Sequence, residues 1–202
     1  MLRLTVDTIS VDVDETPRPN ESPEDLVRRL CRAKAEEGAA RRPEALIIAA
    51  DTVVALEPTS ASGERVVLGK PQDPEDALRM LRLLRNRAHL VYSGLATCLG
   101  DREVVQVVRT TVWMRDYRDS EMEAYVASGD PLDKAAAYAI QHATFHPVAR
   151  IDGCYANVMG LPLCHLYHAL AQYFQPPEPE IQCYEHPDVG CTVPRLLAIP
   201  KS

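Results

Sequence analysis

The sequence contains none of the short motifs that mark several common enzyme classes. It has no Gly-x-Gly-x-x-Gly, no Gly-x4-Gly-Lys-Ser/Thr, no His-Glu-x-x-His and no Gly-x-Ser-x-Gly. No apolar run reaches the roughly 18 residues that a membrane-spanning helix needs. The first residues also lack the basic flank and apolar stretch of a secretory signal. We therefore expect a cytoplasmic protein that has no membrane partner.

Basic residues are outnumbered, and aromatic residues are scarce. The 202 residues include 29 acids and 22 Lys and Arg, for a net charge of −7, and 5% aromatic residues. An excess of acid disfavours binding to a nucleic-acid backbone, although a few well-placed Lys can still bind a small anion. The apolar fraction of 46% is ordinary for a soluble globule. The length predicts one domain with a sizeable core and a short appendage.

The six cysteines are expected to be reduced, because no export signal accompanies them. Cys31, Cys98 and Cys164 lie in apolar patterns and are predicted to pack in the core.

Three further metal-binding side chains lie in the Pro-rich C-terminal segment, namely Cys183, His186 and Cys191. Their spacing fits no standard zinc pattern. A zinc site completed by a ligand from residues 164–168, a disulfide and plain surface thiols all remain open.

Apolar periodicity outlines the fold. Strands are predicted over 2–13, 45–50, 66–68, 90–99 and 104–114, and helices over 22–38, 73–84, 120–129 and 162–174. Residues 57–65 and 153–160 are predicted as loops, and 133–141 as helical or irregular. Because strands and helices alternate while two long strands pair locally, we expect an α/β domain with a mixed, twisted sheet flanked by helices. This domain is expected to span residues 1–174, with a Pro-rich tail over 175–202.

Two residues stand where strands are expected to end. Asp51 follows a buried apolar run, and a carboxylate there can bind a divalent cation or take a proton from water. The alternative is a turn or capping Asp. Lys70 lies between Gly69 and Pro71, where it can hold phosphate or simply be solvated.

Four more polar residues allow a functional and an ordinary interpretation. Glu15 ends an acidic run and can join Asp51 in binding a hard cation such as Mg²⁺. Lys34 lies beside the apolar stripe of its helix, and Lys134 follows an Asp, so each can pair with an acid or bind a ligand. Gln141 can both donate and accept hydrogen bonds, as base recognition requires.

Several segments match a known family in order. They are Val13-Asp14-Glu15-Thr16, Lys34-Ala35, Ala50-Asp51-Thr52-Val53-Val54, Gly69-Lys70-Pro71, Asp133-Lys134-Ala135, Tyr138-Ala139-Ile140-Gln141 and Gly153-Cys154-Tyr155-Ala156-Asn157-Val158-Met159-Gly160-Leu161-Pro162-Leu163. Together they resemble the Maf family of nucleoside triphosphate pyrophosphatases, which are related in fold to inosine triphosphatases. The resemblance covers about residues 2 to 174.

The resemblance implies hydrolysis of a nucleoside triphosphate to the monophosphate and pyrophosphate, with Mg²⁺ or Mn²⁺ and with a homodimer possible. Asp51 is the implied proton acceptor, Glu15 helps to position metal or water, and Lys70 holds phosphate. The implied substrate-binding residues are Lys34, Thr52, Lys134 and Gln141. Thr52 and Gln141 match the branch that acts on dTTP and UTP, in nucleotide-pool house-cleaning.

The sequence also departs from the family pattern. Members of the family begin with a strand and a Ser-x-Ser-Pro-Arg-Arg loop that have no counterpart in this sequence. This difference predicts one of two things: a longer true N-terminus, or a catalytically impaired nucleotide-binding protein that is linked to cell division. Ala136 replaces a usual Gly, and Arg85-Asn86-Arg87 replaces a Gly-containing turn. The latter two differences concern local backbone geometry.

Overall fold

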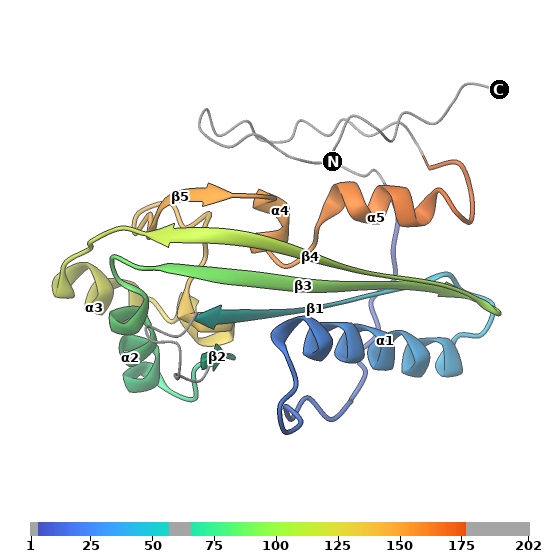
Figure 1. The fold of residues 1–202 in the computed structure, drawn as a ribbon, viewed down its shortest axis with the longest axis horizontal. Coiled ribbons are helices and arrows are strands. Elements are labelled where there is room, and N and C mark those ends of the chain that lie inside the picture. The colour runs from blue at the N-terminus through green and yellow to red at the C-terminus, as the bar shows by residue number, and fades with distance from the viewer. Residues whose placement is uncertain (1–3, 57–65, 177–202) are drawn as a thin grey trace.

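A computed structural model describes residues 4–56 and 66–176. Five strands form one sheet in the order β2-β1-β3-β4-β5, with helices packed around it (Figure 1). The strands are β1 (Ile47–Leu56), β2 (Val66–Leu68), β3 (Ala88–Leu99), β4 (Arg102–Met114) and β5 (Val148–Asp152). The helices are α1 (Pro23–Arg41), α2 (Pro74–Leu84), α3 (Asp119–Ala127), α4 (Tyr155–Val158) and α5 (Leu163–Leu170), with 3₁₀ turns η1 (Asp130–Asp133) and η2 (Ala135–Ala137).

The expected sheet flanked by helices is present, but every described strand pair is antiparallel rather than mixed. β2 and β3 are joined by α2 and run in the same direction. A strand–helix–strand order of this kind in a sequence commonly gives two adjacent parallel strands. β1 lies between them and runs the opposite way, so no parallel pair forms. β3 and β4 form the expected hairpin around residues 100–101.

The helix predicted over 22–38 is confirmed as α1, which continues to Arg41. The Ser22 hydroxyl accepts a hydrogen bond from the Asp25 N–H at 3.1 Å, and Pro23 occupies the first turn. Leu26, Val27 and Leu30 are buried against the sheet. Capping and one apolar stripe thus fix both the start and the orientation of this helix.

Side-chain alternation along the strands divides the core between two faces of the sheet. On one face, odd-numbered residues of β1 such as Val53 and Ala55 pack against α1. On the other face, Ile48 packs near α5, and Val54 and Leu56 pack with α2, α3 and η2. Residues 51 and 52 lie between these apolar regions.

The strand predicted over 2–13 is wrong for its described part, residues 4–13, which have no regular secondary structure. The alternating residues pair with none of the described strands, and Val6 is 62% exposed. The segment is instead attached to α1, where the Arg41 guanidinium donates to the Ser10 carbonyl at 2.7 Å. Alternation reports a period of two but not the presence of a partner strand.

Other differences are local. α3 begins at Asp119 rather than at a Ser120 cap, because the Glu121 carboxylate accepts the Arg118 N–H at 2.9 Å. The loop predicted over 153–160 contains the short helix α4, and α5 ends at Leu170. β5 was not predicted, since its five residues show no clear alternation. The predicted loop 57–65 and all but the first two residues of the predicted tail 175–202 lie outside the described residues.

Two general features concern the described residues alone. No helix among them is both long and apolar enough to cross a membrane. The four cysteines within them, at positions 31, 98, 154 and 164, form no disulfide, and only Cys31 is fully buried. The zinc hypothesis for Cys183, His186 and Cys191 falls on residues that are not described.

Candidate active site

Three of the predicted site residues meet around one ammonium group. The Nζ of Lys34 lies 2.6 Å from Oδ1 of Asp51 and 2.6 Å from Oε1 of Glu15. The Asp51 side chain is only 10% exposed, whereas that of Glu15 is 61% exposed. The cluster therefore has a buried carboxylate, an accessible carboxylate and a cation between them.

Close packing of α1 on the sheet brings these residues together. Gly94 on β3 is the register partner of Asp51 on β1. A Cβ atom at Gly94 would lie 2.3 Å from the Val27 carbonyl oxygen and 2.9 Å from the Cys31 Sγ, so only Gly permits this approach. Lys34 is one turn beyond Cys31 and so reaches Asp51 across the sheet surface.

Burial and charge act in opposite directions on this pair. Burial raises the pKa of Asp51 above its usual value, although the hydrogen bond from Lys34 opposes the change. Burial lowers the pKa of Lys34, but the hydrogen bonds to Asp51 and Glu15 outweigh it and the pKa is raised. A carboxylate whose pKa is raised is a stronger base for water.

The sequence predicted Asp51 at the end of a strand, and this prediction is wrong: Asp51 lies in the middle of β1. The apolar run and the following Val residues form one continuous strand. β2 pairs only with Val54, Ala55 and Leu56 of β1, so the edge of β1 beside Asp51 lies beyond the end of β2. Asp51 therefore lies in a stretch of β1 that is unpaired on this edge because β2 is short.

Lys70 follows the end of β2, near the unpaired stretch of β1 that contains Asp51. It is exposed, and its charge favours the ionised forms of both Asp51 and Asp133. Lys134 lies beside Asp133, with its Nζ 2.7 Å from Oδ1 of Asp133 and 3.0 Å from the Asp130 carbonyl oxygen. Lys70 and Lys134 therefore both interact electrostatically with Asp133.

A strained turn connects the loop that contains Lys70 to the segment that follows Lys134. The N–H of Ala136 donates to the Gly69 carbonyl at 2.8 Å, which joins η2 to the loop that contains Lys70. Ala136 has φ +58° and Ala137 has φ +60°, in the left-handed region that favours Gly. The family's usual Gly at position 136 is explained by this geometry.

Thr52 faces away from the cluster. Its Oγ1 lies 2.7 Å from Oγ of Ser93 and 3.4 Å from the Gly160 carbonyl oxygen, on the side of the sheet opposite α1. Ser93 in turn donates to the Asn157 carbonyl at 3.2 Å. Thr52 thus contacts the loop around α4 rather than Asp51.

The polar network beneath α4 was not predicted from the sequence. Asn157 is fully buried, and its Nδ2 donates to the Val91 carbonyl and to Oγ1 of Thr110. Thr110 also bonds both backbone polar groups of Cys154. The sequence signal for this network was the presence of the small hydroxyl residues Ser93 and Thr110 within the two long strands.

Gln141 lies at a separate hollow of about 260 Å³. The hollow is lined by Ile140, Gln141, His146, Val148, Ala149, Arg150, Ile151 and Tyr155. Tyr155 begins α4, and Thr52 contacts Gly160 just beyond the end of α4. The loop around α4 is therefore the structural link between Thr52 and Gln141.

A divalent cation would depend on Glu15 and Asp51. Within residues 4–56 and 66–176, no group of three or more His, Cys, Asp or Glu side chains is arranged to hold a metal. Two hard carboxylates do converge on one point, where they now share the ammonium of Lys34. This donor set fits Mg²⁺, which commonly uses one or two carboxylates and completes its shell with water and substrate phosphates.

The cluster of acids and lysines beside an open sheet edge defines a candidate phosphate-processing site, and comparison with known proteins identifies the family. The sequence model described as "Maf-like protein" matches residues 1–173. The chain belongs to this family. The resemblance inferred from the ordered motifs is confirmed.

Curated relatives agree with this assignment. A protein of Geotalea uraniireducens is 44% identical over 81% of this chain and 82% of its own length. A protein of Salinibacter ruber is 47% identical over 80% of this chain and 77% of its own length. One of Myxococcus xanthus is 46% identical over 80% and 78% respectively. Each of these relatives is named dTTP/UTP pyrophosphatase.

Proposed function

We propose that this chain is a nucleoside triphosphate pyrophosphatase that converts dTTP and UTP to the monophosphates and pyrophosphate. The observation that supports it most directly is the contact of the Lys34 ammonium with both Glu15 and Asp51. The names of the relatives support the substrate class. Phosphoryl transfer relies on positioning and charge neutralisation, which acids and lysines supply without a covalent nucleophile.

Asp51 acts as the general base in this proposal. The oxygen of water bonds to one of the two phosphorus atoms, α or β, and the bond between that phosphorus and the bridging oxygen breaks. The bridging oxygen leaves with the other phosphate, and a proton of water passes to the Asp51 carboxylate. The raised pKa of Asp51, caused by burial, favours this role. Lys34 has three N–H donors, and two are directed to carboxylates, which leaves one for a phosphate oxygen. Lys70 binds phosphate from the end of β2.

Glu15 and Asp51 would hold a divalent cation, Mg²⁺ or Mn²⁺. When bound, this cation neutralises charge on the phosphates. Thr52, Lys134 and Gln141 are proposed to contribute to substrate binding, Thr52 through the loop around α4. We propose that this domain spans residues 1–174 and is followed by a Pro-rich tail over 175–202. A cytoplasmic location, a homodimer and the absence of a nucleic-acid partner belong to the same proposal.

The test measures pyrophosphate release from dTTP and UTP with Mg²⁺ or Mn²⁺. The 202-residue chain is assayed alone and with a Ser-x-Ser-Pro-Arg-Arg-containing segment joined ahead of residue 1. Asp51→Asn is expected to reduce kcat by about 10³-fold, within the range that a general base supplies, and to leave the circular-dichroism spectrum unchanged. Asp101→Asn, at the exposed β3–β4 turn, is the matched control.

Two outcomes would contradict the proposal. If neither form of the chain releases pyrophosphate while calorimetry detects triphosphate binding, the chain is a nucleotide-binding protein without hydrolase activity. If Asp51→Asn keeps normal turnover, Asp51 is not the base.

A further inference from the structure

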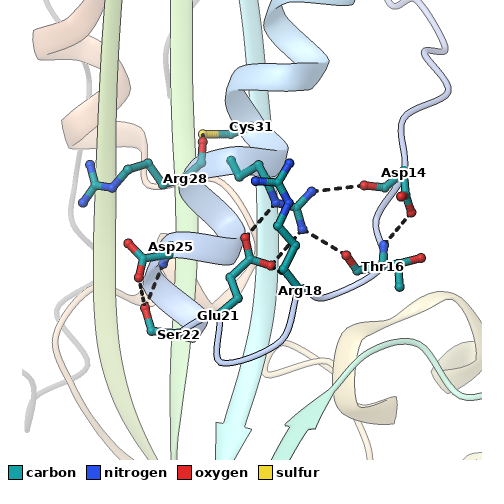
Figure 2. A network of polar contacts seen from close by, with 9 residues as sticks. Asp14, Thr16, Arg18, Glu21, Ser22, Asp25, Arg28 and Cys31 are labelled. Atoms are coloured by element: carbon teal, nitrogen blue, oxygen red, sulfur yellow. Dashed lines mark hydrogen bonds and ion pairs between the residues drawn. The ribbon is translucent and has the colours of Figure 1, made fainter.

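The guanidinium of Arg29, on α1, bonds to the backbone on both sides of Glu15. Its Nη1 donates to the Asp14 carbonyl at 3.2 Å, and its Nη2 donates to the Thr16 carbonyl at 3.0 Å. The Thr16 N–H in turn donates to Oδ1 of Asp14 at 2.9 Å, which closes a small turn around Glu15 (Figure 2). Glu15 is therefore held by its two neighbours rather than by regular secondary structure.

The guanidinium is itself fixed in place by Glu21. Arg29 Nε donates to Oε1 of Glu21 at 2.7 Å, and Nη2 donates to Oε2 at 2.8 Å, a two-point pairing that sets the plane of the guanidinium. The Glu21 side chain is only 8% exposed, and it also accepts the Arg18 N–H at 2.9 Å. Hydrogen bonding to Arg29 holds the pKa of Glu21 down at about 2, so the pair stays ionised at neutral pH.

Glu15 depends on these hydrogen bonds because its segment has no regular secondary structure to hold it. Residues 4–18 have no helix or strand, and the Glu15 side chain is 61% exposed. Fixing the backbone of one residue costs conformational entropy. The two carbonyl bonds from a rigid helix offset this cost at the residue whose carboxylate must reach Lys34.

We propose that Arg29 is a positioning residue that orders Glu15 and so presents its carboxylate to Lys34 and Asp51. The catalytic consequence of this role rests on the proposed function. Arg29 makes no described hydrogen bond to Lys34 or Asp51, and its charge interacts only at longer range with that of Asp51. Its direct contacts are with the backbone on both sides of Glu15, and these carry the proposed role. Lys cannot replace it, because one ammonium lacks the planar fork that reaches a carboxylate and two carbonyls together.

The neighbouring Arg28 provides a matched control. It lies on the same helix and pairs with Glu24 at 2.8 Å, but this pair is exposed and does not involve residues 14–16. Arg28→Gln therefore removes the same charge from the same helix without touching the turn around Glu15.

The experiment combines a structural readout with a double-mutant cycle. The backbone ¹⁵N order parameter of Glu15 is measured by NMR in the unaltered chain and in Arg29→Gln, Arg29→Lys and Arg28→Gln. We expect it to fall in both Arg29 variants and to stay unchanged in Arg28→Gln. Steady-state pyrophosphate release is then measured for Arg29→Gln, Glu15→Gln and the double variant.

Arg29→Gln is expected to lower kcat about 10- to 100-fold, the usual effect of losing a residue that orients a ligand-binding side chain. The double variant is expected to match Glu15→Gln within about twofold, because a residue that acts through Glu15 has no further effect once Glu15 is lost. Arg28→Gln is expected to keep normal turnover.

Three results separate the possibilities. An unchanged order parameter at Glu15 in folded Arg29→Gln or Arg29→Lys overturns the positioning role. Fully additive losses in kcat also overturn it, since they show that Arg29 acts elsewhere. If neither the 202-residue chain nor the form extended ahead of residue 1 releases pyrophosphate, the proposed function fails, and the order parameter alone decides whether Arg29 orders Glu15.

Discussion

Asp51 and Thr52 are consecutive residues of β1, yet their side chains lie on opposite faces of the sheet. The Asp51 carboxylate meets Lys34 of α1, whereas the Thr52 hydroxyl meets Ser93 and the carbonyl of Gly160. Alternation along a strand makes this separation unavoidable. We therefore expect the two residues to perform different tasks, Asp51 in the proposed chemistry and Thr52 in holding the loop around α4.

Thr52→Val is expected to weaken substrate binding more than catalysis. The change removes the bonds to Ser93 and Gly160, and one hydrogen bond of about 0.5–1.5 kcal/mol corresponds to about a 3- to 10-fold rise in KM. We expect kcat for UTP and dTTP to stay within about threefold, as measured by steady-state kinetics. Thr52→Ser keeps the hydroxyl and is the control. A loss of kcat as large as that of Asp51→Asn would place Thr52 in the chemical step instead.

Gly94→Ala should both destabilise the fold and disturb the site. The new Cβ would collide with the backbone of Val27, so α1 must move away from β3 and take Lys34 with it. Overpacking of this kind costs about 3 kcal/mol. Urea denaturation measures the loss, and pyrophosphate release should fall with it. Gly69→Ala, where a Cβ meets nothing within 4 Å, serves as the stability control. Equal stability of Gly94→Ala and the unaltered chain would refute the close-packing argument.

An element of the fold could be predicted from the sequence where neighbouring residues alone determine it. α1 was predictable because its cap and apolar stripe are written in consecutive residues. Residues 4–13 were mispredicted because a strand also needs a partner, which no local pattern supplies. The family resemblance identified Glu15, Lys34 and Asp51, which do meet. It did not indicate Arg29, whose role depends on the path of an irregular segment over the helix.

The opposite orientation of Thr52 was predictable in principle from the period of two along a strand. The family motif Ala50-Asp51-Thr52-Val53-Val54 suggests that Asp51 and Thr52 act at one site, whereas alternation along a strand places their side chains on opposite faces. The position of Asp51 relative to the sheet edge was not predictable, because it depends on β2 being only three residues long. A short strand beside a long one leaves an open edge that sequence alone does not locate.

Ala136→Gly is expected to stabilise the protein. The left-handed conformation of Ala136 costs a non-Gly residue about 1–2 kcal/mol, and the greater flexibility of Gly in the unfolded chain offsets part of the gain. A net gain of about 1 kcal/mol corresponds to about 2–4 °C in Tm for a chain of this size. Ala139→Gly, at a residue without positive φ, should instead lose about 0.4–1 kcal/mol. Thermal unfolding of both variants tests the difference, and a lower Tm for Ala136→Gly would be incompatible with a strained turn.

His89 should make the protein less stable in acid. The residue is 1% exposed and its Nε2 lies 2.7 Å from the Tyr138 hydroxyl, while its Nδ1 has no hydrogen-bond partner among the residues that the structure describes. Burial lowers the pKa of His89 from 6.5 to about 3, so the unfolded chain binds a proton in this range that the folded chain does not. Stability is therefore complete above about pH 6.5 and decreases as the pH falls toward 3.

Between pH 7.5 and 4.5 this single group should cost about 2–3 kcal/mol, since each pKa unit corresponds to about 1.4 kcal/mol. His89→Gln cannot titrate, so its urea-unfolding free energy should fall by that much less over the same interval, even if the variant is less stable at pH 7.5. Parallel pH profiles for His89→Gln and the unaltered chain would mean that His89 is protonated in the folded protein, and that the space around Nδ1 supports a charge.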